Sequence, residues 1–180
     1  MEHKGTKVIE TERLILRPYK KSDAQQMYNN WATDERVTKF LRWSPHQNVE
    51  LTQSLCEIWE NDSQNLNNYL WVIHHKHDNT IIGSIGLVDI NEKKQHGEIG
   101  YCIGYNWWGQ GLVKEALSQI LPYFKQIGFV RISALCNHEN FNSKKLLIKT
   151  GFQYEGLLRK YDFDNAGNLV DMDVYSVILN

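Results

Sequence analysis

The chain is predicted to fold as a single mixed α/β domain over residues 1–180, with a largely antiparallel sheet flanked by helices. Three observations support this prediction. Segments of alternating apolar and polar residues, typical of half-buried strands, recur along the chain. Between them lie segments whose apolar residues repeat with helical spacing. Turns of hairpin type, at 77–79 and 164–167, join two pairs of strand segments.

The composition is that of an ordinary globular domain. With 180 residues, 42% of them apolar, the chain is long enough to bury a core. Its 20 basic and 21 acidic side chains leave a formal net charge of −1, which does not favour a polyanionic partner such as nucleic acid. No apolar run approaches the length of a membrane span, and the first residues lack the apolar region of a signal peptide. We therefore expect a cytoplasmic protein without a membrane or nucleic-acid partner.

Neither the cysteines nor the histidines indicate a metal site. Cys56, Cys102 and Cys136 are far apart and lack CxxC spacing, so reduced thiols buried in the core are expected. A nucleophilic role for Cys102 or Cys136 is the alternative. The three histidines between 74 and 77 include adjacent strand residues that point to opposite faces, so an exposed strand end is expected there.

The N-terminal half is predicted to contain one strand, three helical segments and then two strands. The first strand ends at Pro18, and Ser22 followed by Asp23 is a typical helix start. Ser44-Pro45 breaks the second helical segment before a longer helix begins. The predicted elements are a strand at 13–19, a helix from 22 with an apolar face through Trp31, helices at 34–43 and 48–61, and strands at 69–75 and 80–88.

A strand, a glycine-bearing loop and a long helix form the centre of the predicted fold. Residues 98–103 have the alternating pattern of a strand, and residues 113–124 have apolar residues at helical spacing on one face. Between them, Gly109 and Gly111 let the backbone turn sharply, and the helix directs unpaired N–H groups towards the loop. Such a loop favours an anion, best a phosphate, although a plain strand-to-helix connection has the same pattern. A P-loop does not fit because Leu112 and Val113 follow Gly111, and the dinucleotide fingerprint lacks its third glycine.

The C-terminal part is predicted to be a strand, a helix and a long hairpin. The strand spans 130–136, and the helix runs to Lys149 and is closed by Gly151. Two alternating segments, 153–163 and 169–179, then form the hairpin. An exposed final strand could pair with a second subunit, which suggests a homodimer.

The central loop is similar to the acyl-CoA pyrophosphate loop of the GNAT N-acetyltransferase superfamily. The family pattern is Gln or Arg, two residues, Gly, one residue, and then Gly or Ala. It falls on Trp108-Gly109-Gln110-Gly111-Leu112-Val113, with Trp108 at the polar first position and Val113 at the small last one. In reading Trp-Gly-x-Gly the loop resembles the Rim-type branch, the RimJ/RimL-like ribosomal-protein N-acetyltransferases. Further resemblance to that branch lies in 11–17 with 22–24, in 140–143 with 146–152, and in the hairpin segments 154–159 and 171–176.

The resemblance implies a GNAT fold, in which the sheet is splayed and the pantetheine arm of acetyl-CoA lies in the gap. The gap is expected between the strand ending near Gly104 and the strand ending at Cys136. The N–H of Ile103 is expected to meet the developing oxyanion. Asn140 and Ser143 are expected to bind the cofactor, with helix capping as the structural alternative for both. The pyrophosphate is expected at the backbone of Gly109, Gln110, Gly111, Leu112, Val113 and Lys114.

Acetyl transfer to an amine also requires a base, and the thiolate leaving group benefits from an acid. Leu147 stands where many members of the superfamily have a tyrosine acid, so Ser143 is the local substitute. Glu98 is the best-placed carboxylate for the base, and an ordinary ion pair or a water relay are the alternatives. The acceptor side is expected to combine acidic and aromatic residues from the first helices and the final hairpin. The candidates are Trp31, Trp43, Asp34, Glu35, Tyr161, Asp162, Asp171 and Asp173.

The sequence therefore predicts an acetyl-CoA-dependent N-acetyltransferase without a metal. The Rim-type resemblance implies a protein N-terminal α-amine, of the ribosomal-protein type, as the acceptor. The same branch includes enzymes acting on polyamines, amino acids and aminoglycosides, so a small amine is the first alternative. A non-catalytic acyl-CoA-binding regulatory module is the second.

Overall fold

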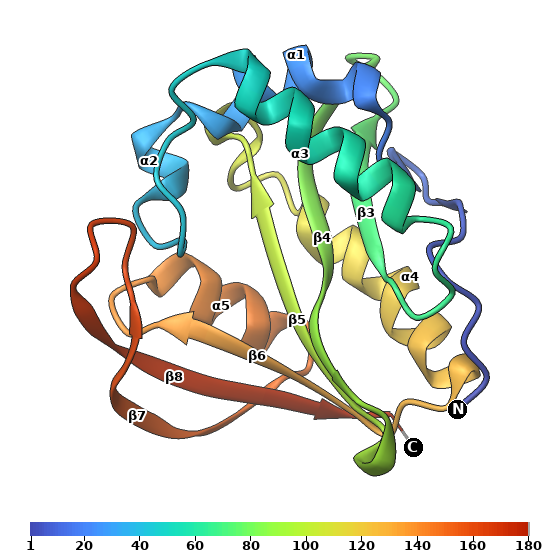
Figure 1. The fold of residues 1–180 in the computed structure, drawn as a ribbon. Coiled ribbons are helices and arrows are strands. Elements are labelled where there is room, and N and C mark those ends of the chain that lie inside the picture. The colour runs from blue at the N-terminus through green and yellow to red at the C-terminus, as the bar shows by residue number, and fades with distance from the viewer. Residues whose placement is uncertain (180) are drawn as a thin grey trace.

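An eight-stranded mixed sheet, ordered β1-β2-β3-β4-β5-β6-β8-β7, runs through the molecule (Figure 1). The structure is a computed structural model, and it describes residues 1–179. The strands are β1 Ile9–Glu10, β2 Leu14–Arg17, β3 Leu70–His75, β4 Thr80–Asn91, β5 His96–Ile103, β6 Arg131–Asn137, β7 Gln153–Phe163 and β8 Leu169–Ile178.

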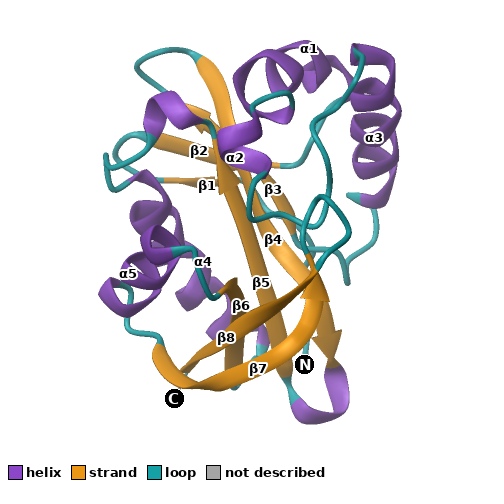
Figure 2. Cartoon of the chain, turned by 90° about the vertical axis from the view of Figure 1, so that its left-hand side faces the viewer, coloured by secondary structure: helices purple, strands orange, loops and turns teal. Residues whose placement is uncertain are grey.

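Helices cover both faces of this sheet (Figure 2). The first face carries α1 (Ala24–Met27) and α3 (Val49–Asp62), and the second carries α4 (Leu112–Ile127) and α5 (Phe141–Lys149). A short α2 (Glu35–Thr38) lies between α1 and α3 in the chain. The remaining turns are the 3-10 segments Lys21–Asp23, Glu92–Lys94 and Tyr105–Trp107 and the π-helical turn Tyr28–Ala32. Within residues 1–179, none of the helices combines the length and apolar character that crossing a bilayer requires.

The sheet is splayed at its centre. β5 and β6 are its parallel pair, and they pair only from His96–Glu98 to Arg131–Ser133. Beyond Glu98 and Ser133 the two strands separate (Figure 1), whereas every other neighbouring pair is antiparallel. The predicted mixed, largely antiparallel and splayed sheet is thus confirmed, and the gap opens between the two predicted strands.

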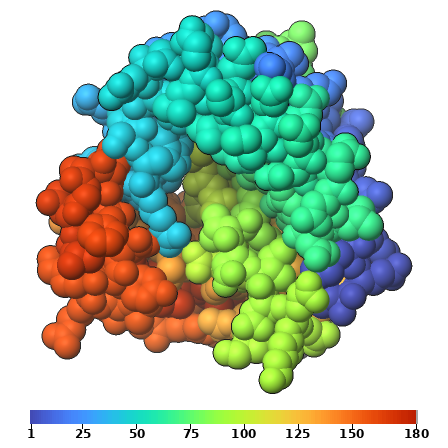
Figure 3. Space-filling view, viewed as in Figure 1, coloured from blue at the N-terminus to red at the C-terminus, as the bar shows by residue number. Residues whose placement is uncertain are grey.

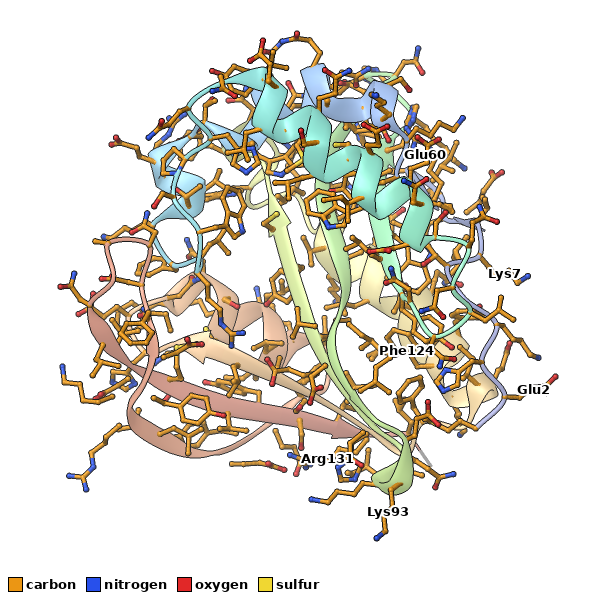
Figure 4. All side chains as sticks on the ribbon, in the orientation of Figure 1. Glu2, Lys7, Glu60, Lys93, Phe124 and Arg131 are labelled. Atoms are coloured by element: carbon orange, nitrogen blue, oxygen red, sulfur yellow. The ribbon has the colours of Figure 1, made fainter. Side chains whose placement is uncertain are left out.

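The core consists of two clusters, one on each face of the sheet. On the α4 face, Phe124 is fully buried and its ring lies 5.5 Å from that of Tyr69 and 5.3 Å from that of Phe129 (Figure 4). On the α1 and α3 face, Trp31 and Met27 pack with Cys56 and residues of β3 and β4. Burial of these large side chains on both faces holds the sheet rigid, so the ends of β5 and β6 are held in fixed positions.

The structure differs from the sequence-based expectations in four places. The helix predicted at 34–43 is limited to α2, Glu35–Thr38, and residues 39–43 form turns and bends. The final strand β8 lies between β6 and β7, so the edges of the sheet are β1 and β7, and the prediction of an exposed final strand is wrong. A homodimer formed by strand pairing would therefore not use β8. The strand predicted at 80–88 continues to Asn91 because a bulge after Leu87 keeps it paired with β5. His75 is 8% exposed and its ring nitrogen lies 2.9 Å from a carboxylate oxygen of Asp78, so it is not part of an exposed strand end.

Candidate active site

A cleft of about 700 Å³ leads from the surface to the gap between β5 and β6. Figure 3 shows the surface hollowed between the segment after α2, the β7–β8 hairpin and the strands β4 and β5. Glu98 and Asp162 line the cleft, as do Arg42 and Trp43 from residues 39–48. Ser143 and Cys136 line its part beside the gap. One continuous space therefore connects the outer surface with the point where the central strands separate.

Two glycines that pair directly, Gly86 of β4 and Gly100 of β5, line the cleft. A Cβ atom at Gly86 would lie 2.3 Å from the carbonyl oxygen of Tyr69, and one at Gly100 would lie 3.0 Å from Val88 Cγ1. Gly86 thus lets the backbone of β3 approach closely, and Gly100 leaves room for the side chain of Val88.

The loop between β5 and α4 has the conformation that the sequence predicts. Gly109 and Gly111 have φ angles of +73° and +76°, a left-handed region that favours glycine. Gly111 is the N-cap of α4 and has no side chain to accept from the first-turn N–H groups. The side chains of Leu112 and Val113 are buried in the core, so only their backbone can face a ligand. The large residue at position 113 therefore leaves the amides of the loop unaffected.

Side chains hold this loop in place from three directions. The indole N–H of Trp108 donates to the carbonyl of Ile103 at 2.8 Å, which ties the loop to the end of β5. Trp107 donates to Asp78 at 2.9 Å, and the side-chain amide of Gln110 donates to the carbonyl of Asn106 at 3.0 Å. Trp108, which stands at the polar position of the family pattern, thus has its own structural role.

The N–H of Ile103 faces the gap. Gly104 N–H donates to the carbonyl of Ile82 on β4 at 2.8 Å. Successive N–H groups along a strand alternate in direction, so the N–H of Ile103 points away from β4. The Trp108 contact occupies only the carbonyl of Ile103, and the N–H keeps a free approach from the gap.

Across the gap, the first turn of α5 presents Ser143. Its hydroxyl lies 2.7 Å from the hydroxyl of Tyr101, a side chain of β5 that carried no sequence signal for a functional role. Asn140 is the N-cap of α5, and its side-chain oxygen accepts from Ser143 N–H at 3.1 Å. Capping, the structural alternative for Asn140, is therefore present, and Asn140 also lines the cleft. Burial raises the pKa of Tyr101 well above its ordinary value, so its hydroxyl stays protonated.

Two cysteines, Cys102 and Cys136, lie beside the gap, and both stay protonated. Burial raises the pKa of Cys102 to about 12, and burial likewise raises the pKa of Cys136. The prediction of reduced, unpaired cysteines is confirmed for all three. Because a thiol and not a thiolate is present at neutral pH, neither Cys102 nor Cys136 is suited to nucleophilic attack.

Two carboxylates and one guanidinium meet at the mouth of the cleft. Arg42 Nε lies 2.5 Å from Asp162 Oδ2, and Arg42 Nη2 lies 3.7 Å from Glu98 Oε1. Burial raises the pKa of Glu98, the positive charge of Arg42 lowers it, and the carboxylates of Asp89 and Asp162 raise it further; the net direction is upward. Arg42 carried no sequence signal, because its partners are distant in the chain.

A bulge in β7 directs Asp162 into the cleft. Leu158 pairs with Met172 and Asp162 pairs with Val170, so β7 has two extra residues over this stretch. Lys160, within the bulge, has a left-handed φ of +49°, and its N–H donates to Asp171 at 2.8 Å. Bulges of this kind commonly redirect a side chain near a functional site.

The predicted acceptor lining is partly wrong. Trp31, Trp43 and Asp162 line the cleft, although Trp31 is fully buried. Asp34 instead caps α2 and pairs with Arg36, and Glu35 lies at a separate shallow depression. Tyr161 is exposed, Asp171 holds the β7 bulge, and Asp173 is buried between Lys144 and His138. Side chains alternate along a strand, so neighbours of Asp162 point elsewhere.

Comparison with known proteins defines the family. The acetyltransferase (GNAT) domain model matches residues 13–153. The chain is 33% identical over 172 residues to an uncharacterized N-acetyltransferase, YoaA, of Bacillus subtilis (strain 168), covering 95% of this chain and 96% of that protein. It is 27% identical over 171 residues to the [Ribosomal protein uS5]-alanine N-acetyltransferase of Escherichia coli (strain K12), covering 85% and 81% of the two chains. The chain therefore belongs to the GNAT acetyltransferase family.

The fold comparison agrees with this assignment. The structure of RimL, a ribosomal L7/L12 alpha-N-protein acetyltransferase in complex with coenzyme A, superposes with a TM-score of 0.85 at 20% identity, covering 96% of this chain and 98% of that chain. Family and fold together define an N-acetyltransferase that uses acetyl-CoA as its cosubstrate.

Proposed function

We propose that this acetyltransferase modifies the N-terminal α-amine of a protein, with a ribosomal protein as the leading class of acceptor. The observation that carries the proposal is the continuous cleft from the β5–β6 gap to a mouth that is both acidic and aromatic. Glu98 and Asp162 supply negative charge there, and Trp43 and Phe163 supply flat apolar surface. A cationic amine at the end of an extended chain suits such a mouth. The related uS5-alanine acetyltransferase supports the same class of acceptor.

We place the cosubstrate with its pantetheine arm in the gap and its pyrophosphate on the loop before α4. The amides of Gln110 to Lys114 face this position, because the first N–H groups of a helix have no intrahelical partner. The loop has room for a phosphate: a Cβ atom at Gly109 would meet no atom within 4 Å, and one at Gly111 would meet only Arg13 Nη2 at 3.9 Å. Asn140, whose side-chain oxygen is used by the cap, keeps its NH₂ group for the pantetheine arm.

In this arrangement Glu98 acts as the base. An α-ammonium has a pKa of about 8, and it is attracted by the net negative charge that Glu98 and Asp162 keep beside Arg42 at the mouth. Glu98 accepts its proton, and the free amine attacks the thioester carbonyl carbon, forming the C–N bond. The N–H of Ile103 stabilises the negative charge on the carbonyl oxygen. The C–S bond then breaks as the thiolate takes the proton of the Ser143 hydroxyl, which Tyr101 orients through their 2.7 Å contact. The nitrogen, now bonded to the acetyl carbon, loses its extra proton to water, and water returns a proton to Ser143.

The test measures release of free thiol from acetyl-CoA with separate acceptors. The informative pair is one lysine-free peptide with a free N-terminus and the same peptide acetylated at its N-terminus. Polyamines, amino acids and aminoglycosides are supplied in parallel. Release with the free peptide alone would support the proposal. Release with a small amine alone would show that the acceptor is a small molecule and not a protein N-terminus. Absence of release despite acetyl-CoA binding would favour a non-catalytic binding module.

A further inference from the structure

The turn between β1 and β2 carries a motif that the acetyl-transfer steps do not use. Residues Thr11 to Arg13 form this turn, which Thr11 N–H closes by donating to the carbonyl of Leu14 at 2.9 Å. The turn packs against the first turn of α4, next to the cofactor loop. The turn and α4 are far apart in the sequence, since Arg13 and Glu115 are separated by 102 positions.

Glu115, in the first turn of α4, receives three hydrogen bonds from this segment. Thr11 Oγ1 donates to Glu115 Oε1 at 2.5 Å, and Arg13 N–H donates to the same oxygen at 2.8 Å. Arg13 Nε donates to Glu115 Oε2 at 2.6 Å. The Glu115 side chain is 17% exposed. Burial by itself would raise the pKa of Glu115, but the hydrogen bonds from Thr11 and Arg13 lower it overall, so the carboxylate is ionised at neutral pH.

Arg13 extends from this carboxylate to the cofactor loop. Its Nη1 donates to the carbonyl of Gln110 at 3.0 Å. Within residues 1–179 no peptide bond is cis, so the Gln110–Gly111 peptide is trans, and its C=O and N–H point in opposite directions. With the carbonyl held towards Arg13, the N–H of Gly111 is turned to the other side of the loop. The orientation of this peptide therefore depends on Arg13.

We propose that Thr11, Arg13 and Glu115 form a clamp that holds the Gln110–Gly111 peptide in the orientation that binds the cosubstrate's pyrophosphate. The inference rests on the proposed placement of the pyrophosphate on this loop. Thr11 and Glu115 are positioning residues, because they act through Arg13 and the first turn of α4. Arg13 positions the peptide through Nη1. Its Nη2 makes no hydrogen bond to residues 1–179 and lies at the open side of Gly111.

For the loss of Glu115, the clamp predicts weaker binding of coenzyme A, whereas charge attraction alone predicts stronger binding. Coenzyme A is a polyanion, so removal of a nearby negative charge would by itself strengthen its binding. The clamp predicts that Glu115→Ala weakens binding, because Arg13 loses the carboxylate that fixes its guanidinium. Glu12 provides a matched control, since it lies in the same turn, is exposed and makes no hydrogen bond or ion pair within residues 1–179. Glu12→Ala changes the charge equally but leaves the clamp intact.

The experiment measures the Kd of coenzyme A by titration calorimetry, without an acceptor, for the unmodified protein, Glu115→Ala, Thr11→Val and Glu12→Ala. We expect Kd to rise about tenfold for Glu115→Ala, as for loss of a charge-assisted contact, and by less for Thr11→Val. Glu12→Ala is expected to bind as the unmodified protein does. In steady-state kinetics Glu115→Ala should raise the KM for acetyl-CoA with little change in kcat.

Several outcomes would overturn the clamp. Equal or tighter binding by Glu115→Ala would leave charge attraction as the sole effect. Equal weakening by Glu12→Ala would point to a general loss of stability, which thermal unfolding without ligand also reports. If Glu115→Ala does not fold, Arg13→Lys is tested in its place. Lysine keeps the positive charge but lacks the forked guanidinium that contacts both Glu115 and the Gln110 carbonyl, so an unchanged Kd for Arg13→Lys refutes the clamp. If the unmodified protein does not bind coenzyme A, the proposed pyrophosphate position on the loop before α4 is refuted. This outcome does not depend on which amine the protein acetylates.

Discussion

Removal of the Arg42 charge should change the pH dependence of acetyl transfer. In the proposed reaction Glu98 works as a base only when it is ionised, and Arg42 favours the ionised form against burial and the carboxylates of Asp89 and Asp162. Arg42→Gln therefore raises the pKa of Glu98. The base is then lost at a higher pH as the solution is acidified, so the acidic limb of the kcat/KM profile moves to higher pH.

The size of this effect follows from the distance and the exposure. Arg42 Nη2 and Glu98 Oε1 are 3.7 Å apart, and the Arg42 side chain is 53% exposed. With a dielectric constant near that of water, which suits a half-exposed pair, the interaction is about 1 kcal/mol. On the acidic limb this corresponds to about a fivefold lower kcat/KM for Arg42→Gln, with little change at high pH.

The assay is thiol release at saturating acetyl-CoA over a range of pH with one lysine-free peptide. Titration of the peptide's own α-amine is common to all variants and cancels in the comparison. Arg42→Lys should keep most of the unmodified profile, and Arg159→Gln, an exposed change on β7, should keep all of it. A loss in Arg42→Gln that is uniform over pH, or a limb that moves to lower pH, would refute the role of Arg42 and Glu98.

Three further predictions concern the acid, the bulge and an ion pair. Ser143→Ala is expected to lower kcat by about 100-fold if Ser143 protonates the thiolate, and Tyr101→Phe by less, because the serine hydroxyl remains; steady-state kinetics measures both. Lys160→Gly is expected to stabilise the fold by about 0.5 kcal/mol in urea unfolding, since relief of left-handed strain exceeds the entropy that glycine loses. Hydrogen bonds from Arg131 and Ser176 hold the pKa of Glu155 at about 2, so this group adds stability above its ordinary pKa that is lost as the pH falls towards 2. Urea midpoints of Glu155→Gln should therefore decline less between about pH 5 and about pH 2.

The conformation of the loop before α4 could be predicted because its signals are local. Glycines 109 and 111 adopt the left-handed φ angles that their positions indicated, and α4 begins directly after them. Backbone amides at a helix start require no particular side chain, so the unusual Trp108 and Val113 did not obscure the pattern. Most elements from β2 to β8 were similarly readable from their periodicity, but the helix predicted at 34–43 is only the short α2.

The acceptor side could not be predicted in the same way. Asp162 and Glu98 are brought together by the splay of the sheet and by a bulge of two residues, neither of which the alternating pattern of β7 shows. Asp171 and Asp173 looked equivalent to Asp162 in the sequence, yet one holds the bulge and the other is buried with Lys144. Arg42 gave no signal at all.

The amino-acid sequence alone determined the fold class and the loop that holds the pyrophosphate in our proposal, because periodicity and glycine placement act over a few neighbouring residues. The family was indicated by the resemblance of its motifs and shown by the matching family model. Only the tertiary structure decided which carboxylates face the cleft, that Tyr101 meets Ser143, and that Thr11 and Arg13 reach Glu115. Those contacts join side chains from distant segments, and their distances depend on strand register, bulges and helix packing, which no local pattern encodes.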